Sequence, residues 1–343
     1  MPLKKPAEAL KYIKAYRLAF IFVSACALIL IVFFSTMVGT IKFSAWEILE
    51  LLKGNVEGEL INQIIVNVRM PRILTGVLVG MNLAVAGVLL QGLIRNPMAS
   101  PNIIGVNAGA GLAAVIIMAL LPERIEGIPI AAFVGAMAAA ALVYLLTSTS
   151  SRDRIVHVAL AGVAVSNLLR AITSGLMMIH SDILDVTYSW LMGSLSGRSW
   201  TAFQTILPYS LVALAVSLII SPKMNLLGLG DDVASSVGLP IRVYRLLIIF
   251  TAAVLAGSAV SVAGTIGFVG LIAPNSARLF VGNDHRYLVP LSAVFGGILL
   301  TLSDTVARTI FQPVELSVGI ITSVLGAPFF LVLLYRKGKE RHA

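Results

Sequence analysis

Two arginines stand immediately before a long apolar run in the stretch VRMPRILTGVL, which covers residues 68–78. Arg69 and Arg72 are three residues apart, and a guanidinium group can bind a carboxylate through two parallel hydrogen bonds. The pair therefore has two interpretations. The arginines can recognise acidic groups of a partner, or their long side chains can reach from the end of a membrane segment to lipid headgroups.

Other polar side chains lie inside or beside apolar runs, where they are costly and tend to face a cavity or another helix. Arg170 is the clearest of them, a single charge in the stretch VSNLLRAITSG. It either lines a cavity and attracts an anionic cargo, or it is buried and bonded to Asn167 or to backbone carbonyls. On these grounds we assign four residues to a translocation path: Gln91, Asn96, Asn167 and Arg170.

The motifs of common enzyme classes are missing from the sequence. There is no G-x-x-x-x-G-K-[ST] phosphate loop, the histidines show no spacing typical of a metal site, and no Ser/His/Asp arrangement is indicated. The stretch GVNAGAG (105–111) is better explained by close helix packing than by nucleotide binding, because Gly76/Gly80 and Gly105/Gly109 are pairs of small residues four apart. We expect a non-enzymatic chain with no cofactor and no metal site of its own.

Composition places these residues in a membrane protein. Of 343 residues, 58% are hydrophobic and 12% are charged, which is too little charge to cover a soluble domain of this size. The net charge of +9 is explained by positively charged cytoplasmic loops, without invoking nucleic acid. Apolar runs of about 20 residues recur along the chain, which is typical of membrane-spanning helices. We predict one all-α membrane domain over residues 1–343 with ten spans, at about 18–38, 73–94, 103–121, 128–147, 156–178, 202–220, 244–263, 266–281, 288–306 and 316–334.

The distribution of Lys and Arg predicts the orientation. Both chain ends are rich in these residues, so both are expected in the cytoplasm, and the number of spans should be even. The stretch VSAC (23–26) resembles a lipoprotein cleavage site, but the apolar run continues to Phe34, which favours an uncleaved first span. With this topology Arg69 and Arg72 lie on the outer side, against the general trend.

Two segments hint at an internal repeat. Residues 69–97 and 242–274 both begin with R-x-x-R, and both carry an Ala-Gly pair whose glycine lies ten residues before a proline. The predicted topology runs them in opposite directions, as in the inverted repeats of many transporters. Because such short matches are common in this composition, coincidence remains the alternative.

Four long stretches resemble the permease subunits of type II ABC importers for iron chelates and cobalamin. One departure is Asn275, where many members of that family carry His. The resemblance implies ten helices per subunit and a two-fold dimer with a second permease subunit, identical or homologous, with the path between them. It also implies two ABC ATPase subunits, which bind the ATP, and an extracytoplasmic substrate-binding protein. The stretches are RMPRILTGVLVGMNLAVAGVLLQGLIRNPMASPNIIGVNAGAG (69–111), LGLGDDVASSVGLPI (227–241), VAGTIGFVGLIAPNSARLFVGNDHRYLVP (262–290) and LSDTVARTIFQPVELSVGIITSVLGAPFFLVLL (302–334).

The resemblance also implies roles for particular residues. Arg69, Arg72 and Arg308 match arginines that form an outer basic pocket and receive an acidic residue from each lobe of the binding protein. Asp304 precedes Arg308 by four residues, so a pair on one helix face could orient Arg308. Gates are implied near the cytoplasmic end of the fifth span, at Ile155, Val156 and Val158.

The longest polar stretch expected between spans on the cytoplasmic side is segment 221–243. Within it, GDDVASSVG predicts a short helix, because acidic residues favour a helix start and glycine favours its end. The resemblance implies that this segment transmits force from the ATPase, and the alternative is an ordinary amphipathic loop. The residues that we predict for coupling are Gly228, Asp231, Asp232, Ala234, Gly238, Leu239 and Pro240.

The expected cargo is a ferric siderophore, taken up across a bacterial cytoplasmic membrane, with cobalamin or haem as the alternative within the same class. An ion-coupled secondary transporter would place carboxylates or histidines at mid-membrane, and here only Asp304 and His157 come near. A passive channel would need a selectivity ring, and no pattern indicates one. Iron that passes already chelated requires no protein ligands, which agrees with the scattered histidines.

Overall fold

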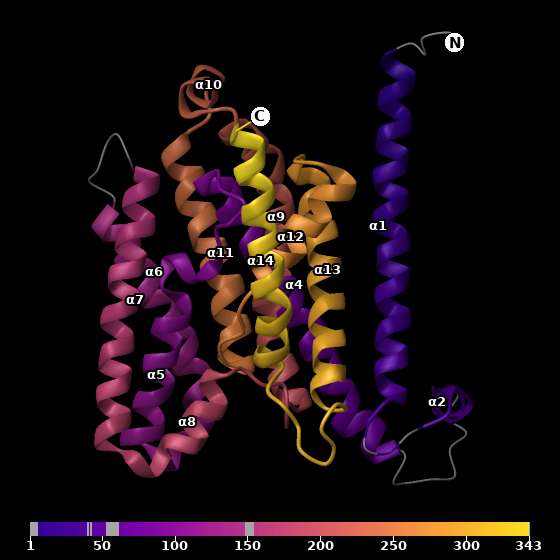
Figure 1. Cartoon of the computed structure of the whole chain (residues 1–343), viewed down its shortest axis with the longest axis vertical. Coiled ribbons are helices and arrows are strands. Elements are labelled where there is room, and N and C mark those ends of the chain that lie inside the picture. Colours follow the sequence, from indigo (N-terminus) through magenta and orange to yellow (C-terminus); the bar gives the residue numbers. More distant parts are fainter. Residues whose placement is uncertain (1–5, 40, 42, 53–61, 148–153, 343) are drawn as a thin grey trace.

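The computed structural model describes residues 6–39, 41, 43–52, 62–147 and 154–342. Within these ranges the regular structure is entirely helical, as predicted, and most helices run side by side along one direction (Figure 1). Ten helices overlap the ten predicted spans: α1 (Pro6–Met37), α4 (Met70–Ile94), α5 (Val106–Leu120), α6 (Ile128–Thr147), α7 (Arg154–Ile179), α9 (Trp200–Gly228), α11 (Ile241–Ala263), α12 (Val269–Val281), α13 (His285–Ala307) and α14 (Val318–His342).

Shorter elements connect these helices. They are α2 (Ala45–Leu52), the π-helix η1 (Gln63–Arg69), the 3-10 turns η2 (Pro101–Ile104), η3 (Pro122–Gly127) and η4 (Ser181–Ile183), and the helices α8 (Leu184–Leu191) and α10 (Asp231–Ser236).

Length and hydropathy separate the spanning helices into two groups. Eight helical segments in the described part of the chain are long and apolar enough to cross a membrane, whereas α5 and α12 are shorter apolar helices. Helical structure is interrupted between α11 and α12, where Gly264 and Phe268 adopt positive φ values of 68° and 65°. The interruption separates α11 from α12, which correspond to the predicted spans 244–263 and 266–281.

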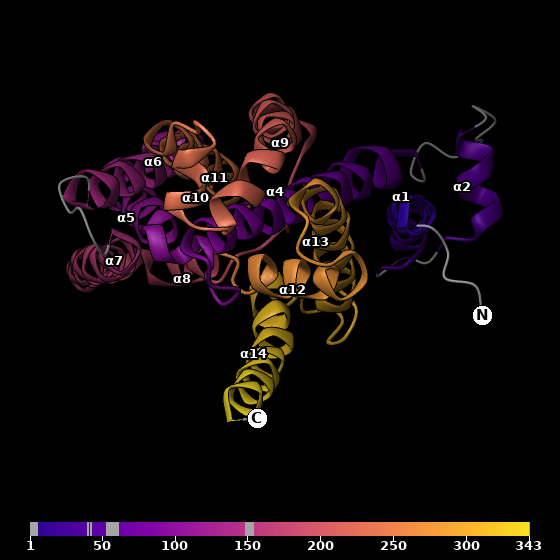
Figure 2. The same cartoon turned by 90° about the horizontal axis from the view of Figure 1, so that it is seen from above.

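The centre of the fold is α4, whose most apolar stretch is 83% buried, against 17% for that of the peripheral α1. Neighbouring helices approach α4 closely because glycines face one another: a Cβ atom on Gly80 would lie 2.2 Å from the carbonyl oxygen of Gly296 in α13. Figure 2 shows α4 crossing the middle of the molecule, with α7 on one side and α1 on the other.

In each of the two predicted pairs of small residues, one glycine lies at a helix crossing and the other does not. Gly80 and Gly109 lie at helix crossings, as expected, with Gly109 against the backbone of Gly135 in α6. Gly76 instead faces the side chain of Leu195, and Gly105 adopts a φ of 78° at the start of α5. Close packing therefore accounts for one member of each pair.

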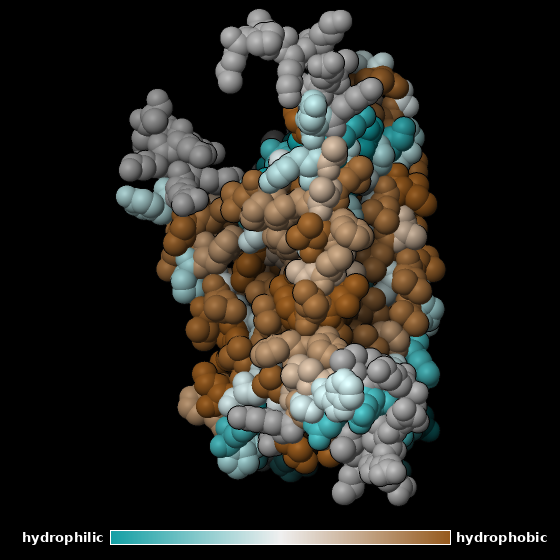
Figure 3. Space-filling model, turned by 90° about the vertical axis from the view of Figure 1, so that its right-hand side faces the viewer, coloured by the Kyte–Doolittle hydropathy of each residue, from teal (hydrophilic) through white to brown (hydrophobic). Residues whose placement is uncertain are grey.

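The molecule has two polar ends separated by an apolar belt, visible as a brown band in Figure 3. The start of α1, the end of α14 and the helix α10 lie together at one end, which we call the α10 end (Figure 1). The helices α2 and α8 lie at the opposite end, together with η1 and the start of α4. We call it the arginine end, because Arg69 is the last residue of η1 and Arg72 lies in the first turn of α4. Both chain ends thus lie on one side, as an even number of spans requires.

The segments of the possible inverted repeat run in opposite directions, since α4 begins at the arginine end and α11 begins at the α10 end (Figure 1). Both matched glycines lie against the backbone of another segment, Gly87 against Gly270 in α12 and Gly264 against Trp190 in α8. Gly264 differs in that it also ends α11 with a positive φ.

Candidate functional site

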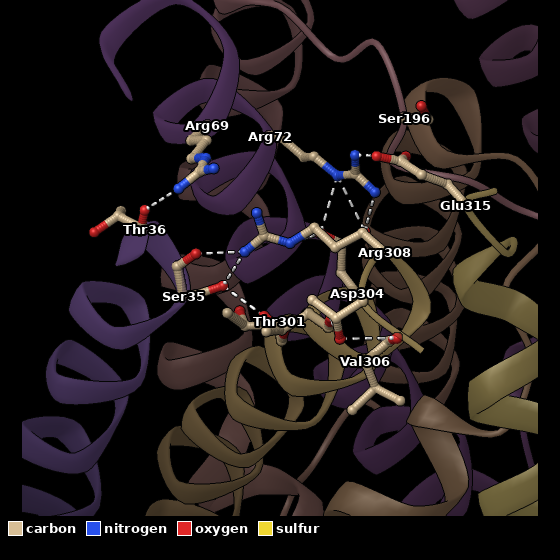
Figure 4. A network of polar contacts seen from close by, with 12 residues as sticks. Ser35, Thr36, Arg69, Arg72, Ser196, Thr301, Asp304, Val306, Arg308 and Glu315 are labelled. Carbon is tan, nitrogen blue, oxygen red and sulfur yellow. Dashed lines mark hydrogen bonds and ion pairs between the residues drawn. The ribbon is translucent and has the colours of Figure 1, made fainter. Parts of the chain in front are cut away.

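The three arginines predicted for docking lie together at the arginine end, but their side chains point into the protein (Figure 4). Arg69, Arg72 and Arg308 are only 5–8% exposed in this chain. Their guanidinium groups do not extend toward lipid headgroups, and each is held by acceptors of the chain itself. We refer to these arginines, together with Asp304 and Glu315, as the arginine cluster.

Arg69 is held by two backbone carbonyls, one in the last turn of α1 and one just beyond it. Its Nη1 donates to the carbonyl oxygen of Thr36 at 2.7 Å, and its Nη2 donates to that of Ile41. The guanidinium carbon lies 4.7 Å from the centre of the Phe43 ring, in cation–π contact. Gly39 is required here, because a Cβ atom at that position would lie 2.6 Å from Nη2.

Arg72 is bound by two carboxylates at once. Its Nε and Nη2 donate to Asp304 at 2.9–3.2 Å, and its Nη1 donates to Oε2 of Glu315 at 2.8 Å. The Asp304 side chain is 4% exposed, while that of Glu315, in the connection between α13 and α14, is 34% exposed. Asp304 is therefore a fixed internal counter-ion, and Glu315 is a partner that solvent can reach.

Arg308 is not chiefly oriented by Asp304, although the predicted pair exists as a 4.0 Å contact between Nε and Oδ2. The Nη2 group of Arg308 donates instead to the backbone carbonyl of Ser35 in α1 and, at 2.9 Å, to the Ser35 hydroxyl. Asp304 mainly serves Arg72. The arginine cluster thus links α1, α4 and α13 at this end of the molecule.

Electrostatics leave the arginine cluster positively charged, because three guanidinium groups face two carboxylates. Partial burial raises the pKa of Glu315, but its hydrogen bond to Arg72 and the charge of Arg72 lower it more, so the pKa lies below its ordinary value of 4.5. Glu315 is consequently ionised near neutral pH and occupies Arg72 as a carboxylate.

Arg170 faces a cavity of about 820 Å³ that lies between α5, α7, α8 and the first half of α14. Its side chain is exposed, and among the described residues it has no hydrogen-bond or ion-pair partner. The alternative in which Arg170 is buried and bonded to Asn167 is therefore not the arrangement found. Asn107 also lines the cavity, and its buried Oδ1 lacks a hydrogen-bond partner.

The other predicted path residues lie elsewhere. Gln91 is buried in α4 and donates to the carbonyl oxygens of Ala99 and Gly270. Its amide therefore links α4 to the connection that follows it and to α12. Asn96 lies at the α10 end, where it accepts a hydrogen bond from the backbone of Met98. Asn167 is exposed on α7 and is absent from the lining of the Arg170 cavity.

The predicted gate residues fall at the start of α7. Val158 is 7% exposed and belongs to the main hydrophobic core, so it does not line a passage within this chain. Ile155 and Val156 lie in the helix, but their side chains are outside the described part of the structure.

The coupling segment contains the predicted short helix, α10, with Asp231 and Asp232 in its first turn. Gly238 ends it with a φ of 80°, a conformation that glycine adopts at little cost. Ala234 and Leu239 are buried and anchor the segment, whereas Gly228, Asp232 and Pro240 are exposed, as are Val233 and Val237. Exposed apolar side chains at a polar end are suited to contact with another protein.

Asp231 ties α10 to the body of the protein. It forms ion pairs with Arg95 at the end of α4, at 2.6 Å, and with Arg245 in α11. Arg95 also donates from Nε to the carbonyl of Leu227 near the end of α9. The carboxylate of Asp231 therefore links α10 to α4 and α11, and Arg95 adds a link to α9.

Sequence analysis missed several of these residues. Glu315 and Arg95 carried no local signal, because their partners lie more than 130 positions away in the chain. Asn82 could have been found as an amide within an apolar run, and it donates to Ser210 in α9 and Ser258 in α11. No group of three or more potential metal ligands lies together among the residues that were described.

Comparison with known proteins connects this architecture to transport. Residues 27–336 match the model of the FecCD transport family. The Fe(3+)-citrate import system permease protein YfmD of Bacillus subtilis is 42% identical over 277 residues, which cover 81% of this chain and 82% of that protein. The cobalamin import system permease protein BtuC of Halobacterium salinarum is 44% identical over 273 residues, covering 79% and 73%. A solved structure of a metal-chelate type ABC transporter in an inward-facing conformation has a TM-score of 0.84 at 31% identity and covers 93% of this chain and 99% of that one.

Proposed function

The chain belongs to the FecCD transport family, the permease subunits of ABC importers for iron chelates, cobalamin and haem, and we propose that its own cargo is a ferric siderophore. The observation that supports this cargo most directly is Arg170, which has no ion-pair partner among the described residues and faces a cavity of about 820 Å³. Ferric siderophores that carry acidic groups are anionic, so an unpaired guanidinium at low dielectric would attract them. Iron would cross the membrane inside its chelator.

Energy would come from two separate ABC ATPase subunits, which bind ATP. The sequence has no phosphate loop, and α10 offers exposed Val233 and Val237 next to the exposed Asp232 at one end of the molecule. A short helix tied by Asp231 to α4 and α11, and through Arg95 to α9, would transmit a movement of the ATPase to these three helices. Arg170 and α14 would face a second permease subunit, identical or homologous, across the path.

Delivery would come from an extracytoplasmic substrate-binding protein at the opposite end. The arginine cluster keeps one positive charge in excess, which favours encounter with an acidic surface. Within it, the Nη1 of Arg72 is the donor that an incoming carboxylate would capture, because its present acceptor Glu315 is reachable from solvent. This assignment places α10 and both chain ends in the cytoplasm of a bacterial cell, with the protein in the cytoplasmic membrane.

Cobalamin or haem is the alternative cargo, and the 44% identity to a cobalamin permease supports cobalamin as that alternative. A secondary transporter driven by ions finds less support, because Asp304 is committed to Arg72 rather than open to a cation path.

Reconstitution into proteoliposomes tests the proposed function. Permease, ATPase and binding protein are combined, and the uptake of a ferric siderophore, cobalamin and haem is measured with ATP inside the vesicles. We expect siderophore uptake that requires both the ATPase and ATP. Uptake by the permease alone would contradict an ABC mechanism, and uptake of cobalamin alone would replace the cargo.

The role of Arg170 is tested in the same vesicles. We expect Arg170→Gln to lower uptake of an anionic ferric siderophore about tenfold, equivalent to about 1.4 kcal/mol of lost attraction, while ATPase assembly is unchanged. Arg124→Gln is the matched control, since Arg124 is exposed at the same end and lies outside the cavity lining. Equal uptake by both variants would remove Arg170 from the transport path.

A further inference from the structure

A second cavity, of about 740 Å³, lies at the α10 end and is separate from the Arg170 cavity. It opens between the ends of α4, α9 and α12, the start of α13 and the second half of α14. Gly228 and Leu229, which lead directly into α10, form part of its wall. Its polar lining includes one carboxylate, Asp284, which accepts a hydrogen bond from Asn225, together with Arg95, Asn96, Asn225, Asn275, Arg278 and His285.

Arg278 is the central group of this cavity, and its side chain is held in place by an amide that is itself fixed. Nη1 of Arg278 donates to Oδ1 of Asn275 at 2.9 Å. The Nδ2 of Asn275 donates in turn to the carbonyl oxygens of Pro97 and Leu271 at 2.9 and 2.8 Å. The amide therefore can present only its oxygen to the guanidinium, which orients Arg278 before any ligand arrives.

No carboxylate in the described part of the chain pairs with Arg278. The acidic groups nearby have other partners. Asp231 is shared by Arg95 and Arg245, and Asp284 accepts from Asn225 at 2.7 Å and contacts Arg17 at 3.8 Å. A partly buried guanidinium without a counter-ion is costly, so the site is electrostatically incomplete in this chain.

The surroundings of the cavity indicate which kind of anion would complete it. Leu229 and Leu279 are lining residues with exposures of 67% and 75%. A free phosphate ion would leave these leucines in water, whereas a protein surface would cover them while inserting an acidic side chain. Arg95 both lines the cavity and holds α10 through Asp231, so an occupant would contact the coupling segment as well.

We propose that this cavity is a second docking site for the ATPase subunit, beside α10, and that it receives a carboxylate side chain of that subunit on Arg278. The inference rests on the proposed function, which supplies the ATPase. The carboxylate would bond to the guanidinium nitrogens that Asn275 leaves free, and the rim leucines would pack against the residues around it. Two contacts on either side of Gly228 would fix the ATPase against rotation around α10.

Chemical cross-linking tests the contact directly. Arg278→Lys keeps the charge and supplies an amine, and a carbodiimide joins an amine to a carboxylate only when the two are in contact. The permease–ATPase complex is treated and the products are mapped by mass spectrometry, with Arg286→Lys as the control. Arg286 is exposed in the first turn of α13, the next helix along the chain, and is not a lining residue. We expect a link from position 278 to an Asp or Glu of the ATPase and none from position 286. Links only within the permease would overturn the proposal.

Binding measurements separate this inference from the proposed function. We expect Arg278→Gln to weaken binding of the purified cognate ATPase at least tenfold, and Arg286→Gln to leave it within twofold of wild type. Wild-type permease that fails to bind the ATPase would contradict the proposed function itself. Equal binding by a properly folded Arg278→Gln variant, or saturable binding of inorganic phosphate or of phosphatidylglycerol vesicles that depends on Arg278, would overturn the ATPase docking site alone.

Discussion

Glu315 differs from the other acidic residue of the arginine cluster in how easily it can be displaced. Asp304 bonds two nitrogens of Arg72 and is almost fully buried, whereas Glu315 bonds one nitrogen and is partly open to solvent. An acidic side chain of a binding protein would compete with Glu315 for Arg72. Glu315 therefore sets how much of the attraction of the arginine cluster is available to a partner.

Neutralising this residue should strengthen capture of the binding protein. We expect Glu315→Gln to raise the affinity several-fold at low salt, because Arg72 is released and the excess charge of the cluster grows. The gain should shrink as salt is added, since exposed charges are screened. The affinity is measured by surface plasmon resonance, with Glu126→Gln, an exposed carboxylate of η3, as the control. Weaker capture by Glu315→Gln would show that the carboxylate supports the site rather than competes for it.

The same contact makes a specific prediction about pH. The pKa of Glu315 is lowered in the folded state, so its ion pair stabilises the protein above the ordinary value of 4.5, and this contribution is lost as pH falls through the lower pKa of the folded state. Wild type should therefore have a higher Tm than Glu315→Gln at pH 7, and the two values should converge in acid. Thermal unfolding in detergent between pH 7 and pH 3 measures the difference. Parallel Tm curves for the two proteins would show that the ion pair adds no stability.

At this scale the sequence indicated the cations better than their partners. Arg69 and Arg72 are recognisable as charges immediately before an apolar run, Arg308 was indicated by the family resemblance, and the three do lie together. Their burial was not predictable, because the acceptors come from Thr36, Ser35 and other groups far away in the chain. The spacing of Asp304 and Arg308 suggested a local pair, but the carboxylate of Asp304 is hydrogen-bonded mainly to Arg72 of α4.

At the scale of the elements, α10 is held by the buried side chains of Ala234 and Leu239 and, at its base, by the ion pairs of Asp231. The carboxylate of Asp231 is bound by Arg95 and Arg245 and is 43% exposed. Ion pairs with such exposure contribute only about 0.2–1 kcal/mol each to stability. Their importance would lie in fixing the direction of α10 relative to α4 and α11.

Removing the ion pairs of Asp231 should uncouple ATP hydrolysis from transport without unfolding the permease. We expect Asp231→Asn to keep the ATPase bound and hydrolysing ATP, while the amount of cargo taken up per ATP falls several-fold. Asp185→Asn is the control, because Asp185 is exposed in α8 at the opposite end and has no ion pair in the described structure. The ratio of uptake to hydrolysis in proteoliposomes measures the coupling. An unchanged ratio in Asp231→Asn would mean that α10 transmits force without this anchor.

Sequence patterns located the elements well because their causes are local. The acidic start and the glycine end of α10 follow from the interaction of charges with a helix terminus and from the backbone freedom of glycine. The contact partners of α10 were out of reach, since Arg95 precedes Asp231 by 136 residues. Likewise, Gly80 could be recognised as a packing residue, but its partner Gly296 could not.

At the scale of the whole molecule, every functional assignment depends on which end faces the cytoplasm. The structure places the positively charged chain ends and α10 at one end, and the arginine cluster at the other. The excess of Lys and Arg near the chain ends favours that end as cytoplasmic. The arginine cluster runs against this charge bias, but its three arginines are outnumbered by the Lys and Arg residues near the two chain ends.

Cysteine labelling tests the orientation in a single experiment. The native Cys26 is first replaced by Ser, and one cysteine is then introduced as Val314→Cys at the arginine end or as Asp232→Cys in α10, both at exposed positions. In right-side-out membrane vesicles, we expect a membrane-impermeant maleimide to label Val314→Cys at once and Asp232→Cys only after the vesicles are opened. The thiol at 314 then shares a compartment with the binding protein, and the thiol at 232 shares one with ATP. The reverse labelling pattern would put the ATPase and the arginine cluster on the same side of the membrane, and neither docking assignment would stand.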